Sequence, residues 1–115
     1  MTTIEYEDVD ATLRVVRLAG RLDVPGTELI STKFAGLATS QSKRVVVDVS
    51  AVTFLASVGI RELVTNAKAL KQRGGKMVIF VGKNADVAHT LDTTGIGTLI
   101  GVFLDATQAD EAART

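Results

Sequence analysis

The chain has 115 residues, of which 46% are hydrophobic, and its 13 basic and 13 acidic side chains give a formal net charge of zero. This length and hydrophobic content predict one domain over residues 1–115 with a packed core, and they exclude a disordered segment. The balanced charge argues against a nucleic-acid surface, and no apolar run reaches the ~18 residues of a membrane span. The lack of cysteine excludes disulfides and thiolate metal sites. We therefore expect a soluble, cytoplasmic protein.

The first third of the chain predicts two strands and a helix. Partial alternation of apolar residues predicts strands over residues 4–6 and 13–18, and the segment Gly20–Asp23 is expected to end this hairpin. Pro25 fits the first turn of a helix, where its missing N–H costs nothing. Apolar residues spaced at i, i+4, i+7 and i+8 then give a helix over residues 25–39 one buried face.

The middle third begins with a valine-rich run over residues 44–49, which predicts a central strand covered on both faces. A loop is expected over residues 50–56. Helical spacing of apolar residues over 58–70 predicts the next helix. Gly74 and Gly75 are expected to end it, since glycine readily adopts the left-handed conformation found at helix ends.

The last third predicts a buried strand over residues 77–81, a short helix near residues 87–91 stopped by Gly95, and a final strand within residues 99–104. Asp105, with a glutamine three positions later, indicates a capping box for a small C-terminal helix. The order β-β-α-β-α-β-α-β-α is typical of an α/β fold. We expect a mixed, mostly parallel sheet of four to five strands, four helices and right-handed crossovers.

Ser57 is the strongest candidate for a site, because it lies at the expected start of the helix after the valine-rich strand, with Gly59 two positions on. A helix N-terminus carries free N–H groups and partial positive charge, so it tolerates an added phosphate. Phosphorylation would add about −1.5 to −2 charges to a neutral domain. The same position also suits a serine that only caps the helix, and the two interpretations are compatible.

Other polar residues have ordinary structural interpretations. Asp23 precedes Pro25 and is expected to be an N-cap. Asp48 is expected to bind loop amides and shape the turn that follows its strand. The polar side of the second helix is expected to be a solvated face, although its member nearest Ser57 could join a docking surface. This polar side consists of Arg61, Glu62, Lys68 and Lys71.

Catalysis finds little support in the sequence. Ser57 lacks a Gly-x-Ser-x-Gly elbow, and no cluster of histidine and carboxylate residues has metal-ligand spacing. The single histidine, His89, lies on the short third helix. The glycines of residues 95–101 have the wrong spacing and context for a dinucleotide loop, and the Walker lysine motif is absent. We therefore expect no enzymatic activity, metal or cofactor.

Several short motifs follow one another across nearly the whole chain: Gly20-Arg-Leu-Asp23, Asp48-Val-Ser50, Val52-Thr-Phe54, Ser57-x-Gly59-Ile60, Leu63, Gly74-Gly75 and Leu91-x-x-x-Gly95. This ordered set resembles the STAS family, in particular the bacterial anti-sigma factor antagonists. The resemblance implies the antagonist fold. It also implies that a cognate anti-sigma factor, a serine kinase, binds the unmodified protein and that phosphorylation of Ser57 dissolves the complex.

The resemblance also implies that Asp23 and the start of the helix around Ser57 meet the partner, and Arg61 is the charged residue of that helix face nearest to Ser57 in sequence. The predicted partner-binding residues are Asp23, Ala56, Ser57, Val58, Gly59 and Arg61. Well-known antagonists commonly carry an acidic residue immediately before the phosphoserine, where this chain has Ala56. Similar domains serve in phospholipid-transport and stress-signalling complexes, so an accessory subunit without a phospho-switch is the alternative. A small enzyme or nucleotide-binding domain is a further rival, and weak self-association stays open.

Overall fold

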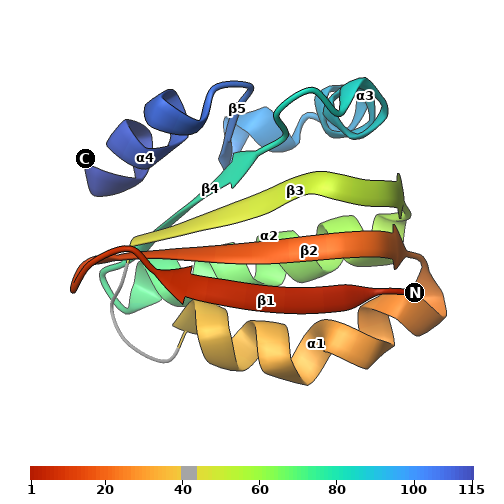
Figure 1. Cartoon of the computed structure of the whole chain (residues 1–115), viewed down its shortest axis with the longest axis horizontal. Coiled ribbons are helices and arrows are strands. Elements are labelled where there is room, and N and C mark those ends of the chain that lie inside the picture. The colour runs from red at the N-terminus through yellow and green to blue at the C-terminus, as the bar shows by residue number, and fades with distance from the viewer. Residues whose placement is uncertain (40–43) are drawn as a thin grey trace.

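The fold is built on one five-stranded sheet, seen in a computed structural model that describes residues 1–39 and 44–115 (Figure 1). The strands, in their order across the sheet, are β1 (Thr3–Asp8), β2 (Leu13–Leu22), β3 (Arg44–Leu55), β4 (Lys76–Phe80) and β5 (Gly101–Phe103). β1 runs antiparallel to β2, and every other neighbouring pair is parallel. The connections hold α1 (Val24–Thr39), α2 (Ser57–Gln72), α3 (Ala85–Thr94) and the 3-10 helix η1 (Ile96–Thr98), and α4 (Ala106–Arg114) ends the chain. The predicted α/β class and the mixed, mostly parallel sheet are confirmed.

Two hydrophobic clusters lie on the two faces of the sheet. Val45, Val47 and Val49 of β3 face the larger cluster, which also holds the buried side chains of α1, α2 and α3. Val46 faces the smaller cluster, where Ala109 of α4 packs. Because β3 is covered on both faces over this stretch, its sequence reads as a continuous apolar run.

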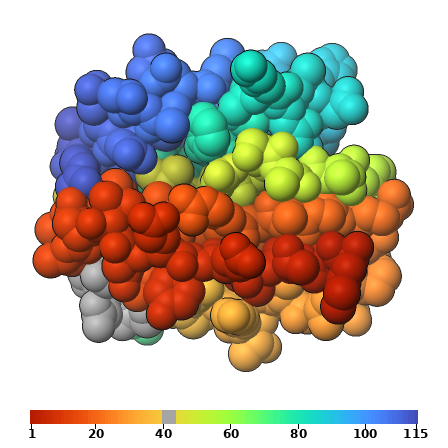
Figure 2. Space-filling model, in the orientation of Figure 1, coloured from red at the N-terminus to blue at the C-terminus, as the bar shows by residue number. Residues whose placement is uncertain are grey.

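The helix α4 covers only part of its face of the sheet. Its buried residues are alanines, and they pack near the start of β2 and β3, against residues such as Leu13 and Val46. Residues of β3 further along the strand remain visible at the surface beside α4 (Figure 2). The exposed ones include Ser50, Thr53 and Phe54.

The predicted loop over residues 50–56 was wrong, because β3 continues to Leu55. Its extension pairs in parallel with residues 19–22 of β2, which itself runs past the predicted end of the hairpin. The side-chain amide of Asn84 supports the extension by donating to the carbonyl oxygens of Val49, Ser50 and Val52 at 3.2, 3.3 and 2.7 Å. Register shifts between β2 and β3 break the simple alternation of buried residues, which hid the strand in the sequence.

The predicted helix ends are confirmed at three positions. Gly74 has a positive φ of 84°, and Gly75 N–H donates to the carbonyl of Leu70 at 3.0 Å as α2 ends. Gly95 ends α3 in the left-handed conformation. The Asp105 carboxylate accepts a hydrogen bond at 2.9 Å from the backbone N–H three residues later, which caps α4. In the described part of the chain, no helix is both long and apolar enough to cross a membrane.

Candidate functional site

The site predicted around Ser57 lies at the carboxyl edge of the sheet. Leu22 and Leu55 are register partners at the ends of β2 and β3. Each strand leads directly into a helix, so α1 and α2 both begin at this edge (Figure 1). The backbone N–H of Ala56 donates to the carbonyl of Leu22 at 3.1 Å and ties the two junctions together. Ligand and partner sites in open parallel sheets favour this edge.

Ser57 is the first residue of α2 and is exposed. Ala56, in extended conformation, occupies the N-cap position and makes no side-chain cap hydrogen bond, so the interpretation of Ser57 as the N-cap was wrong by one residue. The N–H groups of Gly59 and Ile60 both donate to the carbonyl of Ala56, at 3.0 and 3.1 Å. Among the described residues, neither the Ser57 hydroxyl nor the N–H groups of Ser57 and Val58 have a hydrogen-bond partner. Two N–H groups therefore remain available to an anion at the positive end of α2.

Gly59 is buried and brings the first turn of α2 close to β2. A Cβ atom at this position would lie 2.9 Å from Leu55 Cδ1, 3.0 Å from Leu22 Cβ and 3.1 Å from the Leu22 carbonyl oxygen. The glycine thus permits a close approach that fixes where Ser57 stands relative to β2. The spacing of Ser57 and Gly59 therefore has a packing reason of its own.

Asp23 caps α1, as predicted. Its Oδ1 accepts from the backbone N–H of Gly26 at 2.9 Å, and its Oδ2 accepts from Arg21 Nε at 3.0 Å. These two hydrogen bonds, the one from Gly26 first, hold the pKa of Asp23 below its ordinary value. Asp23 is therefore an ionised, half-buried group, with one carboxylate oxygen bonded to the start of α1 and the other to Arg21 of β2.

Exposed apolar side chains adjoin this edge. Phe54 is 44% exposed and Val24 is 57% exposed, although both are large hydrophobic residues. The guanidinium of Arg21 lies 4.6 Å from the centroid of the Phe54 ring, which is a cation–π arrangement. In the sequence, Arg21 and Phe54 stand out only as parts of motifs, because their pairing depends on the register of β2 and β3.

The polar side of α2 is only partly a solvated face. Arg61, Lys68 and Lys71 are exposed as expected. Glu62 is half-buried instead, and it accepts hydrogen bonds from the Ser31 hydroxyl of α1 and from the Asn66 side chain. Glu62 therefore belongs to the contact between the two helices, and its expected solvation was wrong.

Asp48 does bind a backbone amide, but within β3 rather than in a loop. Its Oδ1 accepts from the N–H and hydroxyl of Ser50 at 2.9 and 2.6 Å, and its Oδ2 lies 3.8 Å from Arg17 Nε. Asp23 has other partners, and the Ser57 hydroxyl has none among the described residues. The structure therefore brings Asp23 and Ser57 to one edge and leaves Asp48 outside that group.

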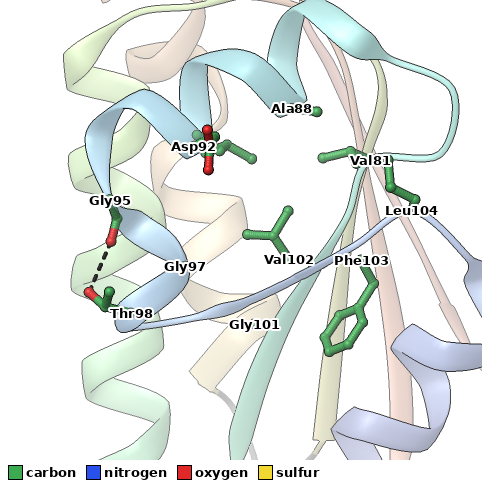
Figure 3. Close-up of a pocket in the computed structure, with 11 residues that line it drawn as sticks. Val81, Ala88, Asp92, Gly95, Gly97, Thr98, Gly101, Val102, Phe103 and Leu104 are labelled. Carbon is green, nitrogen blue, oxygen red and sulfur yellow. Dashed lines mark hydrogen bonds between the residues drawn. The ribbon is translucent and has the colours of Figure 1, made fainter.

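A cavity of about 640 Å³ lies between α3, η1 and β5 (Figure 3). Asp92 is the one ionisable residue in its lining, and the Thr98 hydroxyl is occupied by the carbonyl of Gly95 at 2.9 Å. The rest of the lining is apolar or glycine: Val81, Ala88, Leu91, Gly95, Gly97, Gly101, Val102, Phe103 and Leu104. No residue predicted to act in the site lines this cavity.

The model of the STAS domain matches residues 3–109. The chain belongs to the STAS domain family. The ordered motifs around Ser57 are therefore those of a STAS domain, and the predicted resemblance is confirmed.

Several solved structures share this fold over nearly the full chain. An anti-sigma factor antagonist from Mycobacterium paratuberculosis gives a TM-score of 0.85 at 23% identity, covering 100% of this chain and 96% of that one. An anti-sigma-factor antagonist (STAS) domain protein from Planctomyces limnophilus gives 0.76 at 20% identity, with 99% and 98% covered. The Bacillus cell fate determinant SpoIIAA in its phosphorylated form gives 0.67 at 17% identity, with 96% and 99% covered. The comparison with curated proteins gave no match.

Proposed function

We propose that this STAS domain is an anti-sigma factor antagonist that binds a serine-kinase anti-sigma factor when Ser57 is unmodified and releases it when Ser57 is phosphorylated. The observation that carries the proposal is the exposed Ser57 hydroxyl at the start of a 16-residue helix, beside two N–H groups without partners among the described residues. The similar SpoIIAA fold has been solved in unphosphorylated and phosphorylated forms, which supports a phosphate on such a domain.

The proposed docking surface, here called the Ser57 surface, consists of Asp23, Ala56, Ser57, Val58, Gly59 and Arg61. Ser57 and Arg61 are its exposed members, while Gly59 is buried and acts by holding the first turn of α2 in place. The exposed ring of Phe54 and the side chain of Val24 adjoin it and add apolar area. An exposed polar centre with neighbouring apolar groups suits a protein interface.

Phosphate on Ser57 would act on this surface in two ways. It would add about −1.5 to −2 charges inside a contact that excludes water, and so weaken binding by repulsion and by the cost of desolvation. Arg61 lies four residues further along α2, on the same side as Ser57, and its side chain has no partner among the described residues. The phosphate would therefore pair with Arg61 within the helix and remove that cation from the partner.

Ala56 defines the second candidate, an accessory subunit of a phospholipid-transport or stress-signalling complex without a phospho-switch. The methyl group of Ala56 offers no charge or hydrogen bond to a kinase at the position before Ser57. In that case the start of α2 would serve only as a structural junction and docking point. The two candidates differ in whether a charge at Ser57 changes binding.

The test compares the affinity of Ser57→Asp and Ser57→Ala for the ATPase-type anti-sigma factor encoded in the same genome. We expect Ser57→Ala to bind and Ser57→Asp to bind at least about tenfold more weakly, since a buried uncompensated charge costs several kcal/mol. Thr93→Asp, on the exposed side of α3, is the matched control and should bind like the unmodified chain. Equal affinity of the two Ser57 variants would favour the accessory-subunit role.

A further inference from the structure

A second hollow lies where β3 and β4 begin and α2 ends. This end of the sheet is opposite to the end where α2 begins (Figure 1). The hollow has a volume of about 370 Å³. Four basic residues from three elements line it, and no acidic residue does. We call this hollow the basic groove and define it by Arg44 of β3, Lys68 and Lys71 of α2, and Lys76 of β4.

The floor of the basic groove is apolar. Val64 and Ala67 of α2 lie on one side, while Met77 and Ile100 are almost fully buried beneath it at 5% and 3% exposed. Leu99 lines the groove as well and is 66% exposed, although it is a large hydrophobic residue. A mostly apolar hollow with a few convergent charged groups is the usual form of a small-molecule site.

The four cations of the groove lack partners within the described residues. The five ion pairs found there use other basic residues, and no side-chain hydrogen bond involves Arg44, Lys68, Lys71 or Lys76. The chain as a whole is neutral. The groove is therefore a local concentration of positive charge that the rest of the fold does not offset.

Structural roles account for only part of this arrangement. The C-terminal end of a helix favours cations, which explains Lys71 near the end of α2, and lysine stems can cover apolar surface. Arg44 and Lys76, however, are register partners on adjacent strands, and Lys68 and Lys71 are three residues apart on one helix. Like charges at such spacings repel one another and destabilise the fold. An anion bound near these residues would reduce such repulsion.

We propose that the basic groove binds an amphipathic anion, with a carboxylate or phosphate head group and a short hydrocarbon tail. Lysine and arginine are the side chains that bind such heads, and the apolar floor receives the tail. The volume of 370 Å³ lies near the lower end of the range for small-molecule pockets, roughly 300–1,000 Å³, so a short tail fits. No aromatic side chain lines the groove to stack on a base, which argues against a nucleic acid.

The test titrates the full chain with octanoate and with octyl phosphate below their micelle concentrations, by calorimetry and by amide NMR. Both anions should bind and shift the amide resonances of Val64, Ala67 and Ile100. 1-Octanol, which lacks the charge, and acetate, which lacks the tail, should each bind at least about tenfold more weakly, since a charge-assisted hydrogen bond contributes roughly 1.5–3 kcal/mol. Added NaCl should weaken the binding of the anions.

Matched variants locate the site. The double variant Lys68→Gln/Lys76→Gln should bind octanoate at least about tenfold more weakly. The control Lys33→Gln/Lys83→Gln makes the same change in net charge at exposed lysines outside the groove and should bind normally. Thermal unfolding of both double variants checks that the fold is retained.

Three results of these titrations would contradict an amphiphile site in the basic groove. Absence of binding by both anions, equal weakening in both double variants, or equal binding of 1-octanol and octanoate would overturn the proposal. Vesicles containing phosphatidylglycerol distinguish two sources of the same head-group chemistry. If the chain binds octanoate but does not bind the vesicles, the ligand is a free amphiphile. If it also binds the vesicles, and Lys68→Gln/Lys76→Gln abolishes that binding, the ligand is a membrane lipid.

Discussion

The replacement Gly59→Ala tests how the first turn of α2 is positioned against β2. The added Cβ would stand 2.9 Å from Leu55 Cδ1 and 3.1 Å from the carbonyl oxygen of Leu22, a backbone atom that cannot move without shifting its strand. Overpacking of this kind costs roughly 1–3 kcal/mol. Alanine regains about 1 kcal/mol of helix propensity over glycine. We therefore expect a net loss of about 1 kcal/mol, and up to ~2 kcal/mol, in the free energy of unfolding.

The matched control is Gly36→Ala in α1. Gly36 is exposed, and a Cβ added there would have no atom within 4 Å, so only the gain in helix propensity of roughly 0.5–1 kcal/mol remains. The two variants thus make the same chemical change in two 16-residue helices and should shift stability in opposite directions. Urea unfolding followed by circular dichroism measures both. A Gly59→Ala variant as stable as the unmodified chain would contradict the tight contact assigned between α2 and β2.

Three further substitutions test other parts of the fold. Asn84→Ala should lower the free energy of unfolding, measured by urea denaturation, by roughly 2 kcal/mol, because three β3 carbonyls lose a donor and α3 loses its cap. A loss below ~0.5 kcal/mol would contradict the assigned extension of β3. Thr27→Val should be neutral or stabilise by up to ~1 kcal/mol, because the buried Thr27 hydroxyl has no partner among the described residues, and a clear loss of thermal stability would refute this. Asp10→Asn tests the pH dependence of stability. Hydrogen bonds from Arg114, and then from the amide and hydroxyl of Thr12, hold the pKa of Asp10 below its ordinary 3.8. The stability that ionised Asp10 contributes is therefore present above that pH and is lost as the pH falls through the lower pKa of the folded state. The variant should show a shallower loss of stability below about pH 4, and an unchanged acid profile would exclude this role.

The regular parts of the fold could be predicted because their signals are local. The helical spacing over residues 58–70 and the glycines at 74 and 75 define α2 without any tertiary information. The valine run over residues 44–49 identified the first half of β3 for the same reason. These patterns report which face of an element is buried, and the structure buries those faces.

The errors concern features set by distant residues. The strand over residues 50–55 depends on its register with β2 and on Asn84, which is about thirty residues away in sequence. Glu62 has the composition of a surface residue, and only the approach of α1 brings the Ser31 hydroxyl to it. The N-cap was placed one residue late because a serine is the more usual capping residue than Ala56. Side-chain partners across elements carry no short-range signal.

Ser57 was predicted as the site from both a local pattern and a family resemblance, and the structure adds its physical setting. It shows the hydroxyl exposed, the helix N-terminus unfilled among the described residues, and Gly59 packed so that this turn lies against β2. These features would accept a phosphate with little change in the fold. The basic groove at the other end of the sheet was not predicted, because its four cations come from three separate elements.

The most direct test of the central claim is the phosphorylation state of Ser57 in the chain isolated from its native cell. Intact-mass analysis, followed by fragmentation to map the modified residue, should find a population that carries one phosphate on Ser57, and the chain with Ser57→Ala should lack it. A chain that carries no phosphate under any growth condition, or that carries it only on another residue, would contradict the proposed switch.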